Sequence, residues 1–212
     1  MPTMDALRAG DGRQRLIEAT LDRLAEHGNR GLSLRKIASA AGVTAPLVTH
    51  HFARKDQLLL AAYRHFRTHA RSMYLAAAER AEPDPVERLA AFVGQLLQNN
   101  FANNRQRMKI WVGFLDLVLA DPEMAALQAE SIDLYLEEFS RTVTRIYAER
   151  GEALSAEEAH RHALGINAVL DGLWLECSLN PSRMTQEEAL RVALDMIGKR
   201  IGVSYSDPPG AT

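Results

Sequence analysis

Residues 37–52 decide the fold of this chain, and they read IASAAGVTAPLVTHHF. The stretch is apolar at helical intervals, but Gly42 interrupts it and Pro46 comes shortly afterwards. Glycine is favoured where a helix ends in a left-handed residue, and proline is tolerated in a first turn, where backbone amides are unpaired anyway. With Thr44 as a capping residue, the pattern predicts a short helix that stops at Gly42 and a second helix that begins at once.

The rest of the chain carries the same helical period and lacks the alternating, β-branched runs of strands. We therefore predict an all-α fold of about nine helices. Capping patterns such as Asp84-Pro85, Asp121-Pro122, Ser155 to Glu158 and Thr185 to Glu188 mark the later helix starts. The expected helices are residues 13–27, 34–41, a short helix after Thr44, 55–78, 85–98, 105–119, 122–150, 155–179 and 185–201. Residues 1–12 and 204–212 are expected to be a disordered arm and tail.

Composition narrows the class of protein. The 212 residues are 47% hydrophobic and suit one domain, or a small domain joined to a larger one. No apolar run approaches the length of a membrane span and no export leader is recognisable, so we expect a cytoplasmic protein with no membrane partner. The single cysteine, Cys177, excludes a disulfide or a cysteine zinc site within one chain.

Charge is distributed unevenly along the sequence. Residues 1–81 hold 13 Lys and Arg against 7 Asp and Glu, a net of +6, whereas residues 82–212 hold 12 against 20, a net of -8. A basic first part indicates contact with a polyanion, although chance can also distribute surface charge in this way.

Two short helices joined by a glycine-containing turn match a helix-turn-helix, whose second helix enters the DNA major groove. The helical period places Ile37, Ala38, Ala41, Val43 and Val48 inward. The residues expected to face DNA are Thr44, Ala45, Pro46, Leu47, Thr49, His50 and His51. Ser33, Arg35 and Lys55 stand at neighbouring helix starts, where hydroxyl, cationic and amide groups can hold phosphates. The alternative is a plain pair of core helices in a bundle.

Residues 13–60, and especially the string LSLRKIASAAGVTAPLVTHHFARKDQLLLA, resemble the N-terminal domain of TetR-type transcriptional repressors. The resemblance implies a DNA-binding domain at 13–60, a ligand-binding and dimerisation domain at 61–203, and a homodimer on double-stranded palindromic operator DNA. The family usually has Tyr where this chain has Thr49, which puts that phosphate contact in question. A shorter hydroxyl, or His50 and His51, would have to replace it.

Two tryptophans lie on apolar helices that also carry isolated acids: Trp111 in KIWVGFLDLVL and Trp174 in VLDGLWLECSL. Asn167, Asp171 and Trp174 share one helix face, and a carboxylate beside aromatic rings suits a quaternary ammonium ligand. Together with the T-H-H-F string, these segments resemble the choline-responsive subgroup of the family, which controls betaine synthesis. The predicted effector site is Trp111, Phe114, Asn167, Asp171 and Trp174. The alternative is that the tryptophans only fill the core.

The helix that holds LGINAVLDGLWLECSL is apolar nearly all round, which predicts packing both inward and against a second subunit. Competing classes are a helical enzyme and an adaptor that binds no DNA. His65 and His69 have metal-ligand spacing, but no H-E-x-x-H pattern, phosphate-binding glycine loop or nucleophile motif accompanies them. We therefore expect a regulator with no catalytic residue, no metal and no cofactor.

Overall fold

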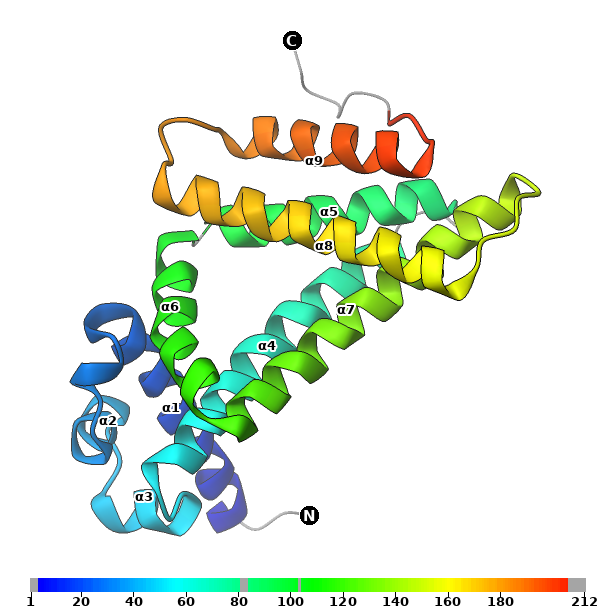
Figure 1. Cartoon of the computed structure of the whole chain (residues 1–212). Coiled ribbons are helices and arrows are strands. Elements are labelled where there is room, and N and C mark those ends of the chain that lie inside the picture. Colours follow the sequence, from blue (N-terminus) through cyan, green and yellow to red (C-terminus); the bar gives the residue numbers. More distant parts are fainter. Residues whose placement is uncertain (1–3, 81–83, 103, 206–212) are drawn as a thin grey trace. The chain divides into compact units, whose positions relative to one another are not determined.

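The computed structural model describes residues 4–80, 84–102 and 104–205, and these residues form helices and their connections without a strand (Figure 1). This confirms the predicted all-α class. The elements are α1 (Met4–His27), the 3-10 turn η1 (Asn29–Gly31), α2 (Leu34–Ala41), α3 (Ala45–His51), α4 (Lys55–Arg80), α5 (Pro85–Ala102), α6 (Asn104–Ala120), α7 (Pro122–Glu149), α8 (Ala156–Leu179) and α9 (Gln186–Ile201).

The start of the first helix differs from the prediction. Helix α1 begins at Met4 rather than at residue 13, so residues 4–12 of the expected arm are helical. Ala6, Leu7 and Arg8 are strong helix formers, which favours the earlier start. Residues 1–3 and 206–212, which we expected to be disordered, lie outside the described residues.

The chain forms two compact units that are not continuous in sequence. The first comprises the described residues up to His69 together with Gln106–Gln128, and the second comprises Ala70–Arg105 and the chain from Ala129 onward. The boundary that we expected between residues 60 and 61 lies inside α4 (Lys55–Arg80). Helices α4 and α7 each contribute residues to both units, a sharing that no linker composition reveals.

The core of the first unit is built from α1 to α4, α6 and the start of α7. The rings of Tyr63 and Phe114 lie 4.7 Å apart between centroids, and the Tyr63 hydroxyl donates to Oε1 of Gln128. Helix α6 approaches α1 closely at Gly113, where an added Cβ would lie 2.9 Å from Cδ2 of Leu24. Helix α6 thus shares one core with the helix-turn-helix elements.

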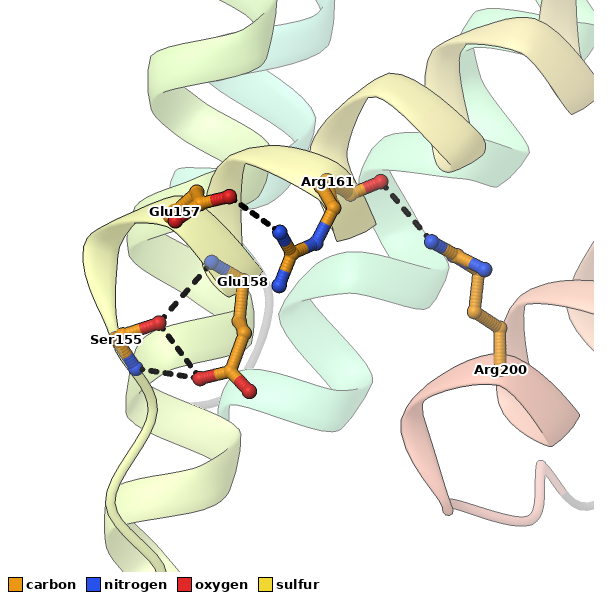
Figure 2. A network of polar contacts seen from close by, with 5 residues as sticks. All are labelled: Ser155, Glu157, Glu158, Arg161 and Arg200. Carbon is orange, nitrogen blue, oxygen red and sulfur yellow. Dashed lines mark hydrogen bonds and ion pairs between the residues drawn. The ribbon is translucent and has the colours of Figure 1, made fainter.

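The second unit packs α5, α8 and α9 together, with α8 and α9 side by side and antiparallel (Figure 1). Both begin with a capping box, in which Ser155 pairs with Glu158 and Thr185 with Glu188, as the sequence predicted. Figure 2 shows how the start of α8 meets α9: Arg200 donates to the carbonyl of Arg161 at 3.1 Å.

Gly165 of α8 lies against Arg200 of α9. An added Cβ at Gly165 would lie 2.7 Å from Nε of Arg200, so this glycine leaves room for the arginine side chain. Among the described residues, none of the helices combines the length and the apolar character that a membrane crossing requires.

Candidate functional site

The break at Gly42 is a left-handed helix end, as the sequence predicted. Gly42 has φ 62° and ψ 35°, and the amide of Val43 donates back to the carbonyl of Ala38 at 3.0 Å. This is the hydrogen-bond pattern with which glycine closes many helices. At the other end of α2, the Ser33 hydroxyl accepts from the amide of Lys36 at 3.3 Å. Both ends of α2 are therefore fixed by local chemistry that can be read in the sequence.

A long-range contact also fixes the turn. Nη2 of Arg15, on α1, donates to the carbonyl of Ala41 and, at 2.8 Å, to that of Gly42. A cation at the carbonyl end of a helix is favourable for the helix dipole and for the last unpaired carbonyls. An added Cβ on Gly42 would lie 2.8 Å from this same nitrogen, so Gly42 provides both the backbone conformation and the space for Arg15.

The predicted inner face of the helix-turn-helix is the inner face in the structure. Ile37, Ala38, Ala41 and Val48 are buried in the core of the first unit, and Val43 packs against it half-buried. On the opposite side, the exposed residues are Thr44, Ala45, Pro46, Thr49 and His50. Helix α3 and its N-cap Thr44 therefore expose five of the seven residues expected to face outward.

Leu47 and His51 correct the prediction, because both are half-buried. They lie against α1 at Gly12, where an added Cβ would be 2.9 Å from Cδ2 of Leu47 and 3.5 Å from Nε2 of His51. Burial lowers the pKa of His51, and His50 and Arg13 lower it further. The helical period alone could not show that α1 packs against this side of α3 at Gly12.

The other side chains predicted to contact DNA differ in their exposure and in the hydrogen bonds that they already make. Arg35 is exposed, and Lys55 is half-buried at the first position of α4. The Thr44 hydroxyl makes no capping hydrogen bond at the start of α3. The Thr49 hydroxyl donates to the carbonyl of Pro46 at 3.0 Å, so it would have to give up this bond to donate to a phosphate.

Two residues of α1 bear on this surface, although no sequence pattern had pointed to them. Arg15 holds the turn, and the guanidinium of Arg13 stacks 5.3 Å from the centroid of Phe52, directly after α3. Both lie within a predicted helix, but nothing in their local spacing indicates partners more than twenty residues away.

The five predicted effector residues are divided between the two units, and each is described within its own unit. Trp111 and Phe114 belong to the first unit, where Trp111 packs half-buried against the core and Phe114 is fully buried beside Tyr63. This environment supports a packing role for Phe114 and leaves its ligand contact without support.

The other three predicted effector residues lie on α8 in the second unit. Nδ2 of Asn167 donates to Oδ2 of Asp171 at 2.9 Å, which agrees with the shared helix face that their spacing predicts. Trp174 is half-buried and Asp171 is exposed. Within α8, the Asp171 carboxylate is therefore exposed and held by Asn167.

Histidines offer no metal centre in the described part of the chain. The rings of His65 and His69 stack with centroids 6.1 Å apart, yet no group of three or more His, Cys, Asp or Glu could hold an ion among the residues that the structure describes.

Comparison with known proteins adds to this geometry. Residues 16–62 match the model of the family "Bacterial regulatory proteins, tetR family", and residues 85–202 match that of "BetI-type transcriptional repressor, C-terminal". The chain belongs to the TetR family. Its C-terminal part is of the BetI type, so this regulator is a transcriptional repressor and not an enzyme, as the sequence predicted.

Individual relatives agree with this assignment. The regulator is 31% identical over 199 residues to the HTH-type transcriptional regulator BetI of Yersinia pestis (strain Pestoides F), which covers 91% of this chain and 94% of the relative. A candidate transcriptional regulator from Pseudomonas aeruginosa PAO1 has a crystal structure with a TM-score of 0.80 and 29% identity, covering 90% of each chain. A Saccharomonospora viridis protein, solved in complex with choline, shares the fold with a TM-score of 0.74 and 21% identity, covering 89% of this chain and 96% of that one.

Proposed function

We propose that this BetI-type regulator represses transcription by reading palindromic operator DNA with the outer side of α3. The observation that carries the proposal is the exposed set Thr44, Ala45, Pro46, Thr49 and His50 on a short helix. Arg35 and Lys55 at neighbouring helix starts add positive charge, which attracts phosphates on either side. The few hydrogen-bonding side chains on α3 favour a large contribution from DNA shape to specificity.

The homodimer is proposed to form through α8 and α9. Large apolar side chains are exposed on both helices, at Leu164, Leu175 and Leu179 of α8 and at Val192 and Met196 of α9. Apolar surface of this kind on a water-facing helix pair is typical of subunit contacts. A two-fold axis would place two α3 helices about one turn of B-DNA apart, roughly 34 Å, which matches a palindrome.

A small quaternary ammonium compound such as choline is the proposed effector. The support is the BetI-type C-terminal part of this chain and the choline bound to the Saccharomonospora viridis protein of the same fold. Within this chain, Asp171 with Asn167 and the half-buried ring of Trp174 offer charge and an aromatic face on α8. The effector would act by binding better to a dimer geometry that no longer fits the operator.

Operator binding is tested with DNA fragments that flank the regulator's own gene, at a series of salt concentrations. Affinity should fall steeply as salt rises, because phosphate contacts release counterions. Thr44→Ala and His50→Ala should each weaken binding by roughly three- to tenfold without loss of the dimer. Thr144→Ala, which removes an exposed hydroxyl from α7, serves as the matched control. Affinity that is absent at low salt, or independent of salt, contradicts the proposal.

The dimer is tested by sedimentation of Leu175→Glu and Leu164→Glu. A charge in an apolar subunit contact should yield monomers, whereas Leu119→Glu adds the same charge to an exposed leucine of α6 and should leave the dimer intact. Equal behaviour of the three variants would place the subunit contact elsewhere.

The effector is tested by calorimetry with choline and with its uncharged carbon isostere. Choline should release heat and the isostere should not, and Asp171→Asn together with Trp174→Ala should abolish the heat. If no quaternary ammonium compound gives heat, Trp174 and Trp111 are packing residues and the effector belongs to another class.

A further inference from the structure

Helix α3 buries few of its side chains in the core of the first unit. It is seven residues long, and Val48 is its one fully buried residue. One buried side chain does not by itself fix the rotation of a short helix about its axis, so the residues next to Val48 also bear on the direction of the outer residues. Leu47 and His51 are the two half-buried residues of α3.

Both of these side chains meet α1 at one position, Gly12. Gly12 is buried, and an added Cβ there would lie 2.9 Å from Cδ2 of Leu47 and 3.5 Å from Nε2 of His51. The 2.9 Å separation is below the distance at which real Cβ atoms are found, so even a methyl group would displace Leu47. Directly after Gly12, the Arg13 guanidinium stacks 5.3 Å from the Phe52 ring centroid and so meets the residue immediately after α3.

We propose that Gly12 is a positioning residue for DNA recognition, because its missing side chain lets Leu47 and His51 seat α3 on α1. Val48 fixes one side of α3 in the core and the contact with Gly12 fixes a second, and together they set the direction of Thr44, Thr49 and His50. Leu47 and His51 are then anchors of the reading helix rather than readers of bases. The inference rests on the proposed DNA-binding role of α3.

Helix propensity makes this position easy to test. Glycine is unfavourable inside a helix, so a residue with a side chain at position 12 should favour α1 by itself. If the side chain met no neighbour, the protein would therefore be at least as stable as the wild type. A purely structural role of the contact predicts instead a fall in melting temperature that accounts for any loss of operator affinity. A positioning role predicts that the same change lowers operator affinity, because overpacking at this contact tilts α3.

The experiment compares Gly12→Leu with the wild type in operator binding, thermal unfolding and sedimentation. Operator affinity should fall at least about tenfold, while the dimer and the helical content are kept. The double variant Gly12→Leu with Leu47→Ala moves the leucine volume across the contact and should restore most of the affinity. Gln14→Leu, on the side of α1 where Gln14 donates to Glu18 at 2.7 Å, adds the same side chain elsewhere and should bind like the wild type.

The outcomes separate the two proposals. Wild type that fails to bind DNA at low salt overturns the role of α3 as a whole. Wild type that binds, with Gly12→Leu binding equally well, overturns the positioning role alone. An affinity loss that Leu47→Ala does not restore, accompanied by a matching fall in melting temperature, also overturns it, because Gly12 would then serve only the stability of the core.

Discussion

Helices α2 and α9 end in the same way in two different units of the molecule. At α2, Gly42 has φ 62° and Arg15 donates to the carbonyls of Ala41 and Gly42. At α9, Gly202 has φ 70° and Arg150 donates to the carbonyls of Ile201, at 3.1 Å, and Gly202, at 2.8 Å. In both cases a left-handed glycine exposes the last carbonyls of a helix, and an arginine from elsewhere in the unit satisfies them.

The two helix ends differ in the segment that comes after each of them. After Gly42 only Val43 and Thr44 precede α3, so any change of the turn is passed directly to the reading helix. After Gly202 there is no further helix within the described residues, and Arg150 is also held by the Tyr147 ring, 4.4 Å away, and by Glu152 at 3.4 Å. If α3 binds DNA as proposed, the helix end at Gly42 bears on DNA recognition, whereas the helix end at Gly202 bears on the stability of the second unit.

Replacing the two glycines should separate these roles most strongly. Gly42→Ala and Gly202→Ala each force a non-glycine residue into the left-handed region, which costs about 1 to 2 kcal/mol of folding stability. An added Cβ would also approach the arginine, at 2.8 Å for Gly42 and 3.1 Å for Gly202. We expect Gly42→Ala to lower operator affinity at least about tenfold. Gly202→Ala should lower the melting temperature and leave the affinity of the folded dimer unchanged.

Gel-shift titration and thermal unfolding at one protein concentration provide the measurements for the glycine pair. Equal operator affinity of the two variants would mean that the turn after α2 does not control α3.

Removing the arginines should have a smaller effect of the same kind. Arg15→Leu leaves the carbonyls of Ala41 and Gly42 without their donor, and Arg150→Leu does the same at α9. Because these carbonyls can still reach water, the loss of stability should be about 1 kcal/mol in each case. Arg15→Leu should also weaken operator binding by roughly threefold, whereas Arg150→Leu should not.

Denaturant unfolding and fluorescence anisotropy with labelled operator measure the two effects of the arginine variants. Arg15→Lys is the charge-matched control for the loss of positive charge near DNA. If Arg15→Lys binds as weakly as Arg15→Leu, the planar guanidinium and its two hydrogen bonds matter. If Arg15→Lys binds like the wild type, charge alone explains the effect and the turn is not braced by Arg15.

Helices α2 and α8 each begin with a serine N-cap. Ser33 accepts from the amide of Lys36 at the start of α2, and Ser155 accepts from that of Glu158 at the start of α8. Ser33→Ala should cost about 1 kcal/mol of stability. Ser155→Ala should also destabilise the protein, but only Ser33→Ala should change operator affinity, and then by less than the Arg15 variant. An affinity change in Ser155→Ala would contradict the separation of the two units in function.

The smallest expected effect concerns one histidine in each unit. Burial is the main cause that lowers the pKa of His51 and of His162 below the ordinary 6.5, with His50 and Arg200 respectively as the next causes. As the pH falls, each histidine is therefore protonated at a higher pH in the unfolded chain than in the folded chain. The free energy of unfolding should fall as the pH drops through 6.5. His51→Gln and His162→Gln should each reduce this pH dependence.

Histidine ring-proton chemical shifts in nuclear magnetic resonance spectra and melting curves between about pH 7.5 and about pH 5.5 would measure the titration. Titration of His51 or His162 at or above the ordinary value of 6.5 would contradict the half-buried placement.

Several parts of the fold could be predicted because their causes are local. The end of α2 at Gly42, the start of α3 after Thr44 and the capping boxes at Ser155 and Thr185 depend on residues within a few positions of one another. The inner side of the helix-turn-helix could also be predicted, because a helical period assigns Ile37 and Val48 to one side whatever surrounds them.

Other features depended on neighbours that are distant in sequence. The period that placed Val48 inward also placed Leu47 and His51 outward, but both are half-buried because α1 packs against that side of α3 at Gly12. Likewise Trp111 and Trp174 look alike in sequence, yet they belong to different units, and Phe114 is enclosed by rings from α4.

The sequence by itself determined that this regulator is all-helical, where most of its helices begin and end, and which family it joins, because capping groups and helical period act over a few residues. Only the tertiary structure decided which side of α3 remains free, what braces the turn at Gly42, and how α4 and α7 are shared between units. Those outcomes depend on steric contact and hydrogen bonds between segments tens of residues apart in sequence. A local sequence pattern does not specify which distant segment packs against it.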